Sequence, residues 1–368
     1  MAGRIVLFGA TGYTGALTAR ALVRRGAKPV LAARSKERLA RLAEELGGLE
    51  TCVADVTRPE TVRALVQGRD VLISTVGPFR RWGAPAIEAA IDAGAVYIDS
   101  TGEPAFIRRV FERYGPEAER TGASLLPAFG YDWVPGNLAG ALALSEAGRQ
   151  ATRVQIAYFG QGEAGSSAGT RASVIGALFE PSFGFRAGRL RTERTGARVS
   201  KFDLDDSRGR FAISVGGSEH LTLPALYPQL QYVDVLLGMG GAHVRFMPLI
   251  SGVAAGASKL PPARAALEGV LGRQAKGFTG PDEAARSRTR SAVLATACTA
   301  DGRERSAVRL DGPNSYTFGF EMLAWAATAA AAGNVTSPGA LGPVAAFGLR
   351  ELEAGVRAAG ISRAREAS

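Results

Sequence analysis

The amino-acid sequence predicts an α/β protein with a doubly wound parallel sheet and an inserted α+β domain. Up to about residue 130, short apolar runs alternate with helix-length segments, and a glycine-rich turn follows the first run. After residue 150 the pattern changes to longer stretches of alternating polarity. Strand–helix alternation specifies βαβ units, so the first domain is predicted to be of Rossmann type and the inserted one to hold an antiparallel sheet.

Each element of the first domain is predicted from its apolar pattern and from the residue that bounds it. Arg4–Phe8 is continuously apolar and ends at glycine, as expected of a strand buried on both faces. Leu17–Arg25 has an apolar stripe and is followed by Gly26, a typical helix stop. The other predicted strands are Pro29–Ala33, Thr51–Ala54, Asp70–Thr75, Val96–Ile98 and Ala123–Pro127. The other predicted helices are Glu37–Leu46, Pro59–Gln67, Ala84–Ala93 and Pro104–Tyr114.

The second domain is predicted from alternating strands and one turn. Ala300–Arg303 is expected to join two strands as a hairpin. The expected strands are Arg153–Phe159, Arg210–Val215, Ser291–Ala297 and Ser306–Leu310, and the expected helices are Ser166–Phe179, Glu321–Ala332 and Pro343–Gly360. The predicted domains are residues 1–148, the inserted substrate and dimerisation domain 149–333, and a C-terminal helix, 334–368, that returns to the first domain.

Composition excludes several classes of protein. At 368 residues the chain is longer than a domain with one hydrophobic core usually is, so two domains are expected. Its 46% hydrophobic content is that of a globular rather than a disordered chain. No apolar stretch reaches the length of about 20 residues that a membrane span needs, and the opening strand leaves no room for a signal peptide, so we expect a cytoplasmic protein. Cys52 and Cys298 cannot form a disulfide framework, and no Cys or His cluster predicts a metal site.

The net charge is +10, from 44 basic and 34 acidic residues, which favours acidic partners such as nucleic acid, an anionic membrane or a phosphorylated ligand. Because the arginines are scattered with acids between them, we expect a generally basic surface and no nucleic-acid partner. The segment Arg186–Lys201 is the densest basic run. It is either a solvated loop or edge hairpin, or a contact for an acidic carrier protein or phosphorylated substrate.

A glycine-rich loop stands directly between the first strand and the first helix. Its residues are Gly9, Ala10, Thr11, Gly12, Tyr13, Thr14 and Gly15. Glycines in this turn let the backbone approach a pyrophosphate, and the helix N-terminus offers N–H groups to it. The spacing is one residue longer between the first two glycines than in the commonest dinucleotide fingerprint. The loop predicts a dinucleotide site.

The end of the second strand predicts which dinucleotide binds. NAD-binding domains carry an acid there, whereas this chain has Arg34 and Ser35, followed by Lys36. A guanidinium forms strong, often bidentate bonds to a phosphate, so we expect Arg34 to bind the 2′-phosphate of NADP(H), with the help of Ser35. The alternative is that Arg34 is a solvated surface residue.

Other strand ends supply further predicted cofactor residues. Asp55 and Val56 are expected at the adenine edge, and the chain crosses the nicotinamide side after the fourth strand. The residues predicted for that side are Thr75, Val76, Gly77 and Pro78, followed after the next strand by Asp99 and Gly102. The alternative for Thr75 and Asp99 is helix capping and turn formation.

Tyr131 and Asp132 are the candidate catalytic residues, because they follow the strand that ends at Phe129 and precede the helix that begins at Pro135. We expect Tyr131 to protonate an enolate or alkoxide and Asp132 to orient it or bind a substrate amine or hydroxyl. Alternatively, Asp132 only caps the helix. The two histidines, His220 and His243, are expected on a surface or at an interface.

Several motifs resemble the saccharopine dehydrogenase-like reductases, in particular the branch that contains trans-acting enoyl reductases. They are the glycine loop and the segments Gly77–Phe79, Tyr97–Glu103, Phe129–Pro135 and Gly342–Gly348. The resemblance implies an inserted domain that covers the nicotinamide and often forms homodimers. It implies NADPH-dependent reduction of a C=C bond in an apolar, carrier- or CoA-linked substrate, or of a C=N bond in imine or amino-acid chemistry. A non-catalytic NADP-binding regulator is the third hypothesis.

Overall fold

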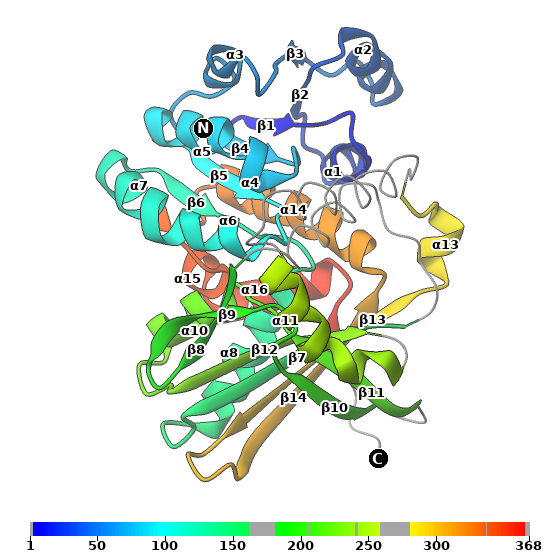
Figure 1. Ribbon diagram of the computed structural model, residues 1–368. Coiled ribbons are helices and arrows are strands. Elements are labelled where there is room, and N and C mark those ends of the chain that lie inside the picture. The colour runs from blue at the N-terminus through cyan, green and yellow to red at the C-terminus, as the bar shows by residue number, and fades with distance from the viewer. Residues whose placement is uncertain are drawn as a thin grey trace. The chain divides into compact units, whose positions relative to one another are not determined.

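The computed structural model describes residues 3–161, 181–204, 207–239, 242–257, 280–335 and 337–364 (Figure 1). The chain forms two compact units. The first comprises Met1–Thr101, Phe106–Val134 and Tyr316–Gly360, and the second comprises Gly102–Ala105, Pro135–Ser315 and Ile361–Ser368. The expected divisions were after residues 148 and 333, whereas the units divide after Val134 and Ser315.

The first unit holds a seven-stranded sheet in the order β15-β6-β5-β4-β1-β2-β3, in which every pair is parallel. The strands are β1 Ile5–Phe8, β2 Val30–Ala33, β3 Thr51–Val53, β4 Val71–Ser74, β5 Val96–Asp99, β6 Ser124–Leu126 and β15 Gly339–Ala340. The predicted doubly wound sheet is confirmed, and the predicted strands are observed within one residue of their expected bounds. The chain order reverses between β1 and β4, which is where ligands of such sheets bind.

Helices cover both faces of this sheet, which explains why β1 and β2 are continuously apolar and buried. The helices are α1 Tyr13–Arg24, α2 Lys36–Glu45, α3 Pro59–Arg63, α4 Phe79–Trp82, α5 Ala84–Ala93, α6 Pro104–Arg109, the π-helical turn η1 Val110–Tyr114, α7 Gly115–Thr121, α14 Ser315–Ala331, α15 Pro343–Phe347 and α16 Leu349–Ala358. Side chains of α3, α5, η1 and α7 pack in one core cluster with Val6, Phe8 and Leu72 of the strands. Helices α1 and α14 are joined by ion pairs from Arg24 and Arg25 to Glu321.

Four helix predictions for this unit have wrong bounds. The expected helix Leu17–Arg25 begins four residues earlier, at Tyr13, and the expected helix Glu321–Ala332 begins six residues earlier, at Ser315. The expected helix Pro343–Gly360 is divided into α15 and α16, because Gly348 adopts a φ of +79° that an α-helix cannot accommodate. The expected helix Pro59–Gln67 ends at Arg63, although Leu65 and Val66 still pack in the core.

The second unit contains a mixed nine-stranded sheet. Its order is β10-β11-β12-β7-β13-β14-β16, with β8 pairing with β12 and β9. The strands are β7 Arg153–Gln161, β8 Pro181–Arg186, β9 Arg189–Arg194, β10 Val199–Leu204, β11 Ser207–Ser214, β12 Tyr232–Met239, β13 Arg290–Cys298, β14 Glu304–Pro313 and β16 Ser362–Arg363. The helices are α8 Val134–Ala147, α10 Glu219–Leu226, the 3₁₀ turn η2 Ala242–Phe246, α11 Met247–Ala257 and α13 Glu283–Ser287.

The expectation of a purely antiparallel second sheet is wrong, because β12 runs parallel to β7. Polarity alternation specifies a half-buried strand but not its direction, and a long connection separates these two strands. The predicted hairpin is confirmed, since β13 and β14 pair antiparallel and Thr299 N donates to Arg303 O across the turn at 3.0 Å. The expected helix Ser166–Phe179 lies outside the described residues.

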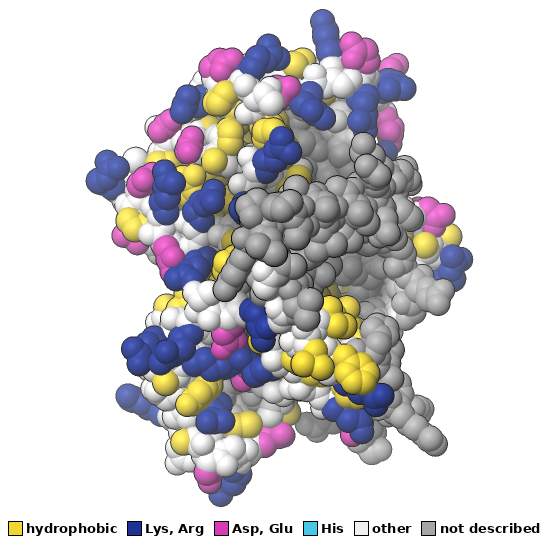
Figure 2. All heavy atoms as spheres, in the orientation of Figure 1, with side chains coloured by type: hydrophobic (Ala, Val, Ile, Leu, Met, Phe, Trp, Pro, Cys, Tyr) yellow, Lys and Arg dark blue, Asp and Glu magenta, His cyan; other side chains and the backbone are white. Residues whose placement is uncertain are grey.

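Charges are distributed widely over the face drawn in Figure 2, where basic side chains alternate with acidic ones over the first unit. Within the described ranges, no helix is long and apolar enough to cross a membrane. The same ranges contain no group of three or more His, Cys, Asp or Glu side chains that is placed to hold a metal ion.

Candidate functional site

The glycine loop lies at the carboxyl end of β1 and is fixed to the neighbouring strand. The N–H groups of Gly9 and Ala10 both donate to the carbonyl of Ala32 in β2, at 2.8 and 3.1 Å. Gly12 N then donates back to Gly9 O at 2.9 Å. The loop is therefore a closed turn whose conformation is set by backbone hydrogen bonds.

Two of the loop glycines are required by close contacts. Gly9 has a φ of +88°, and a Cβ there would lie 2.6 Å from Thr75 Oγ1, at the end of β4. A Cβ on Gly15 would lie 2.2 Å from Gly9 O, so the absence of a side chain lets α1 start directly against the loop. Thr75 Oγ1 donates to both Phe8 O and Gly9 O at 3.2 Å. Thr75 thus braces the loop, and its contact with a nicotinamide remains a prediction.

The N-terminus of α1 has the features of an anion site. Its N-cap is Gly12, no side chain caps the first turn, and that turn contains no acidic residue. The first helical bond runs from Ala16 N to Gly12 O at 2.9 Å. The preceding N–H groups of an α-helix have no partner within the helix, and the helix dipole makes this end positive. The loop and this helix end fit a pyrophosphate.

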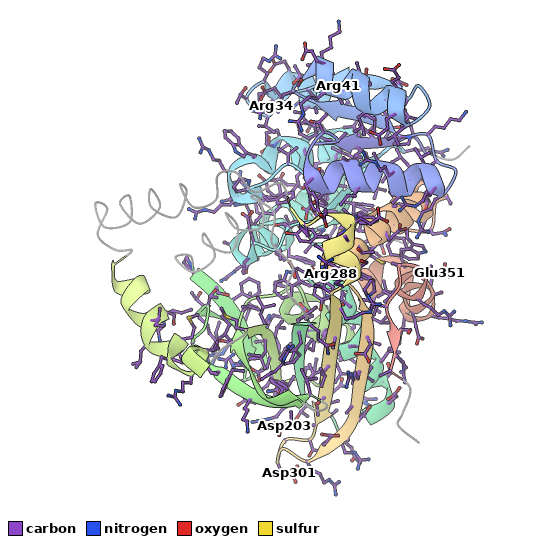
Figure 3. All side chains as sticks on the ribbon, turned by 90° about the vertical axis from the view of Figure 1, so that its right-hand side faces the viewer. Arg34, Arg41, Asp203, Arg288, Asp301 and Glu351 are labelled. Carbon is purple, nitrogen blue, oxygen red and sulfur yellow. The ribbon has the colours of Figure 1, made fainter. Side chains whose placement is uncertain are left out.

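Arg34 lies at the end of β2 with its side chain exposed (Figure 3). Within the described ranges it makes no hydrogen bond and no ion pair. It is close enough to Asp55 for its charge to help lower the pKa of that carboxyl. A surface guanidinium without a protein partner is available to a phosphate.

The neighbours of Arg34 are engaged within the protein. Ser35 is the N-cap of α2: its hydroxyl accepts from Arg38 N at 3.2 Å and donates to the carboxylate of Glu37 at 2.9 Å. The Arg38 guanidinium donates to the carbonyl of Thr11, which ties α2 to the glycine loop. The sequence pattern did not reveal this contact, because a basic residue in the first turn of a helix has no typical partner.

Asp55 and Val56 follow β3 at the same edge of the sheet. The Asp55 carboxylate accepts from the backbone N–H and the hydroxyl of Thr57, both at 2.9 Å. These hydrogen bonds, and then the charges of Arg34 and Arg58, hold the pKa of Asp55 below its usual value. Val56 packs against the core cluster of the first unit.

Asp99 ends β5, is fully buried and fixes the next turn. Its Oδ1 accepts from Thr101 N and from Ala128 N, both at 2.8 Å. Ala128 has a φ of +59°, a left-handed conformation that is costly for a residue with a side chain. Asp99 thereby positions the segment that follows β6. This is the turn-forming role that the sequence analysis gave as the alternative for Asp99. Gly102 begins Gly102–Ala105, a short segment that belongs to the second unit.

Tyr131 and Asp132 lie just after that turn, at the same carboxyl edge of the parallel sheet. The Tyr131 ring meets Phe318 of α14 edge to face, with ring centroids 6.2 Å apart. Asp132 is half-buried, and burial raises the pKa of its carboxyl to about 6. In the described part of the chain, the Asp132 side chain makes no hydrogen bond or ion pair, so helix capping is not observed. A carboxyl of this pKa can hold and release a proton near neutral pH.

Residues of α14 that contact the glycine loop and Tyr131 were missed by the sequence analysis. Tyr316 packs edge to face on Tyr13, with ring centroids 5.2 Å apart, and Phe318 packs on Tyr131. These partners are about 190 to 300 residues away along the chain, and the helix was assigned to the second domain. No local pattern could have paired them.

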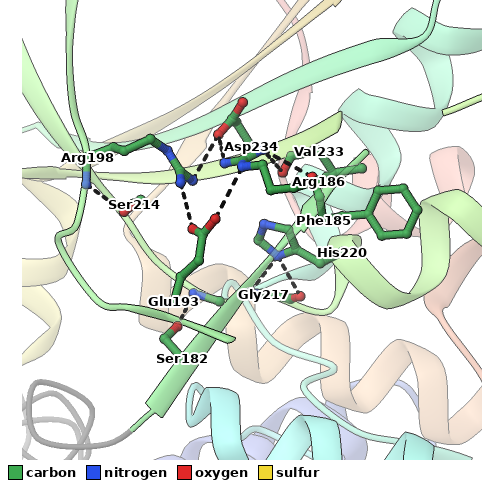
Figure 4. A network of polar contacts seen from close by, with 11 residues as sticks. Ser182, Phe185, Arg186, Glu193, Arg198, Ser214, Gly217, His220, Val233 and Asp234 are labelled. Carbon is green, nitrogen blue, oxygen red and sulfur yellow. Dashed lines mark hydrogen bonds and ion pairs between the residues drawn. The ribbon is translucent and has the colours of Figure 1, made fainter. Parts of the chain in front are cut away.

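The basic segment Arg186–Lys201 forms the hairpin β8–β9 and the start of β10 (Figure 4). Arg186 and Arg198 both pair with Glu193 and Asp234; the Arg198 nitrogens lie 2.6 Å from Glu193 Oε2 and 3.1 Å from Asp234 Oδ1. These two arginines therefore have internal partners. The other three, Arg189, Arg191 and Arg194, are exposed and make no ion pair with the residues that the structure describes.

The expectation that His220 lies on a surface or at an interface is wrong. The side chain is 2% exposed, and its Nδ1 lies 3.1 Å from both N and O of Gly217 (Figure 4). Burial lowers the pKa of His220 to about 4, so the ring is neutral at physiological pH. The side chain of His243 lies outside the described residues.

The switch point between β1 and β4, the glycine loop and the uncapped α1 define a Rossmann-type dinucleotide-binding domain. More particularly, residues 5–128 match the family described as the saccharopine dehydrogenase NADP binding domain. This segment is therefore similar to the NADP-binding domains of that family, which confirms the predicted family resemblance and the predicted cofactor class.

Known proteins resemble the chain in part or in fold. A Mycobacterium tuberculosis protein named trans-acting enoyl reductase is 40% identical over 140 residues, which are 36% of this chain and 34% of the relative. The protein of that name from Mycobacterium ulcerans is 39% identical over 140 residues, with the same two coverages. The match thus spans about a third of the length of these relatives. The saccharopine dehydrogenase (L-Glu forming) of Saccharomyces cerevisiae shares the fold, at a TM-score of 0.61 and 13% identity over 96% of this chain and 97% of that one.

Proposed function

We propose that the chain is an NADPH-dependent reductase that transfers hydride to a C=C bond of a largely apolar, thioester-linked substrate. The observation that carries the proposal is the glycine loop leading into the uncapped α1, with the exposed Arg34 at the end of the adjacent strand. The match to an NADP-binding domain of an oxidoreductase family supports it.

The proposal assigns separate roles to two groups that bind the cofactor. The N–H groups at the start of α1 bind the pyrophosphate, and Arg34 binds the 2′-phosphate. Bound NADPH supplies the hydride. Thr75 and Asp99 act as positioning residues, because the first braces the glycine loop and the second fixes the turn before Tyr131.

Tyr131 and Asp132 provide the proton in this proposal. Hydride delivery to one carbon of the double bond leaves negative charge on the thioester, which is neutralised when the other carbon takes up a proton. The Tyr131 phenol donates that proton. Asp132, whose carboxyl is neutral below a pKa of about 6, supplies the proton that restores the phenol.

The substrate class rests on the relatives that are named enoyl reductases. A second candidate, reduction of a C=N bond in an imine or amino-acid adduct, is favoured by the match to a domain named for saccharopine dehydrogenase. Both candidates use the same cofactor residues and differ only in the substrate. For either candidate function we also propose that the protein is a homodimer and lies in the cytoplasm.

A turnover assay tests the proposal. Purified protein and NADPH are mixed with crotonyl-CoA, longer enoyl thioesters or cyclic imines, and cofactor oxidation is followed by absorbance. Saccharopine, which is an amine and can only donate hydride, is mixed with NADP+ instead, and cofactor reduction is followed. Turnover of an enoyl thioester that Tyr131→Phe abolishes is the expected result. Turnover of imines alone would establish the second candidate, and NADPH binding without turnover of any substrate would favour a regulatory protein and contradict the proposal.

A further inference from the structure

Large apolar side chains are exposed together on η2 and α11, two consecutive helical elements of the second unit. Of the five large hydrophobic residues that are exposed in the described ranges, three fall within five positions: Phe246, Leu249 and Ile250, at 48%, 71% and 53% exposure. Single exposed apolar residues are ordinary, but a cluster of this kind marks an interaction site. We call these three residues, with Arg194 and Arg245, the α11 surface.

The α11 surface is the outer side of an otherwise packed element. Val244, Met247 and Ser251 of η2 and α11 are buried, and the first two form a core cluster with Ile213 of β11. The spacing of Phe246, Leu249 and Ile250 is that of one helix face. The inner side thus packs in the core cluster beside the sheet, whereas Phe246, Leu249 and Ile250 on the outer side stay about half or more exposed.

Two arginines border the apolar side chains. The Arg245 guanidinium lies over the Phe246 ring, 4.8 Å from its centroid. Arg194 of β9 reaches α11, since its Nη1 would be 2.6 Å from a Cβ on Gly252. Figure 2 shows apolar side chains gathered over α11 with basic ones beside them.

The surrounding sequence is also basic. Between Asp234 and Asp282 the only acidic residue is Glu268, whereas the basic residues there are Arg245, Lys259, Arg264, Arg273 and Lys276. A second copy of the chain would bring arginines against arginines on this surface, so self-association is disfavoured. The charge favours an anionic partner.

We propose that the α11 surface binds an anionic lipid membrane. An amphipathic helix lies in a membrane interface with its apolar side chains inserted and its basic residues at the lipid headgroups, and such insertion requires projecting side chains rather than a groove. Leu249, the most exposed of the three, projects in this way. The inference does not rest on the proposed reductase activity.

Vesicle sedimentation tests the proposal with the full chain. The wild type is expected to sediment with vesicles of three parts phosphatidylcholine to one part phosphatidylglycerol, less so in high salt, and not with pure phosphatidylcholine. The double variant Leu249→Ser/Ile250→Ser should lower the partition coefficient by about tenfold or more. Leu226→Ser, at an apolar residue that is 39% exposed elsewhere in the unit, is the matched control and should leave it unchanged.

Charge is tested in the same way. The double variant Arg194→Gln/Arg245→Gln should weaken binding to the anionic vesicles, whereas Arg305→Gln, at an exposed position on β14, should not. NADPH binding of every variant should match that of the wild type, which shows that the variants are folded. The proposal is overturned if the wild type does not sediment with anionic vesicles, or if the control variants lose as much binding. It is likewise overturned if the protein binds polyglutamate but no vesicles, or if the apolar variant instead dissociates a dimer in light scattering.

Discussion

Replacing Gly9 by alanine tests the geometry of the glycine loop. Alanine must adopt a φ of +88°, and a left-handed conformation costs about 1–2 kcal/mol for a residue with a side chain. Its Cβ would also lie 2.6 Å from Thr75 Oγ1 and 2.9 Å from Val76 Cγ2. Thr75 cannot turn away freely because its hydroxyl bonds Phe8 O and Gly9 O. Overpacking of this kind costs about 1–3 kcal/mol, so we expect a total loss of about 2–5 kcal/mol.

Gly26→Ala is the matched control for this variant. Gly26 has a similar φ of +79°, but an added Cβ would meet nothing within 4 Å. We therefore expect it to lose only the conformational cost, about 1–2 kcal/mol. The free energy of unfolding is measured by urea denaturation of both variants. Their difference isolates the clash with the end of β4.

Cofactor titration completes the test. Displacement of the loop should weaken NADPH binding by Gly9→Ala at least tenfold, about 1.4 kcal/mol, whereas Gly26→Ala should bind NADPH like the wild type. Equal losses of stability in the two variants, or undiminished NADPH affinity in Gly9→Ala, would refute the described packing of the loop against Thr75.

Three further predictions concern titratable side chains. Tyr131→Phe should lower kcat by about 10²–10⁴-fold and leave NADPH affinity intact, and full turnover would remove Tyr131 from the proton transfer. Because the native pKa of Asp132 is about 6 against an ordinary 3.8, the wild type should lose stability as pH rises from 4 to 6, and Asp132→Asn should not; identical urea-denaturation profiles would contradict the described burial. The native pKa of His220 is lowered to about 4, so stability should fall as pH falls from 6.5 to 4. His220→Gln should reduce this dependence of the free energy of unfolding on pH. An unchanged pH dependence would mean that other groups cause the loss of stability in acid.

The parallel sheet was predictable because its strands are buried on both faces and bounded by strong turn residues. β1, for example, is continuously apolar, and β4 is apolar up to its last residue, Ser74; each is followed by a turn that contains glycine. The direction of β12 against β7 was not predictable, because polar and apolar residues alternate in the same way in a parallel and in an antiparallel strand. The place of α14 in the first unit was also hidden, since its contacts with Tyr13 and Tyr131 span most of the chain.

The candidate site was predictable where the backbone imposes a residue type. Gly9 and Gly15 are required by close contacts, so their positions in the sequence predicted the tight loop at which a phosphate is expected to bind. The role of Asp99 remained open in the sequence, because an aspartate at a strand end can bind a ligand or hold a turn; its bond to Ala128 N shows the second role. The pKa of Asp132 depends on burial by distant segments, which no local pattern encodes.

The binding preference for NADPH over NADH tests the central claim most directly. Calorimetric titration of the wild type should show NADPH binding tighter by about ten- to a hundredfold, since charged hydrogen bonds contribute about 1.5–3 kcal/mol. Arg34→Gln should abolish this preference, whereas Arg41→Gln, at another exposed arginine of the same region (Figure 3), should retain it. Equal or tighter binding of NADH by the wild type, or a preference that survives in Arg34→Gln, would contradict the account.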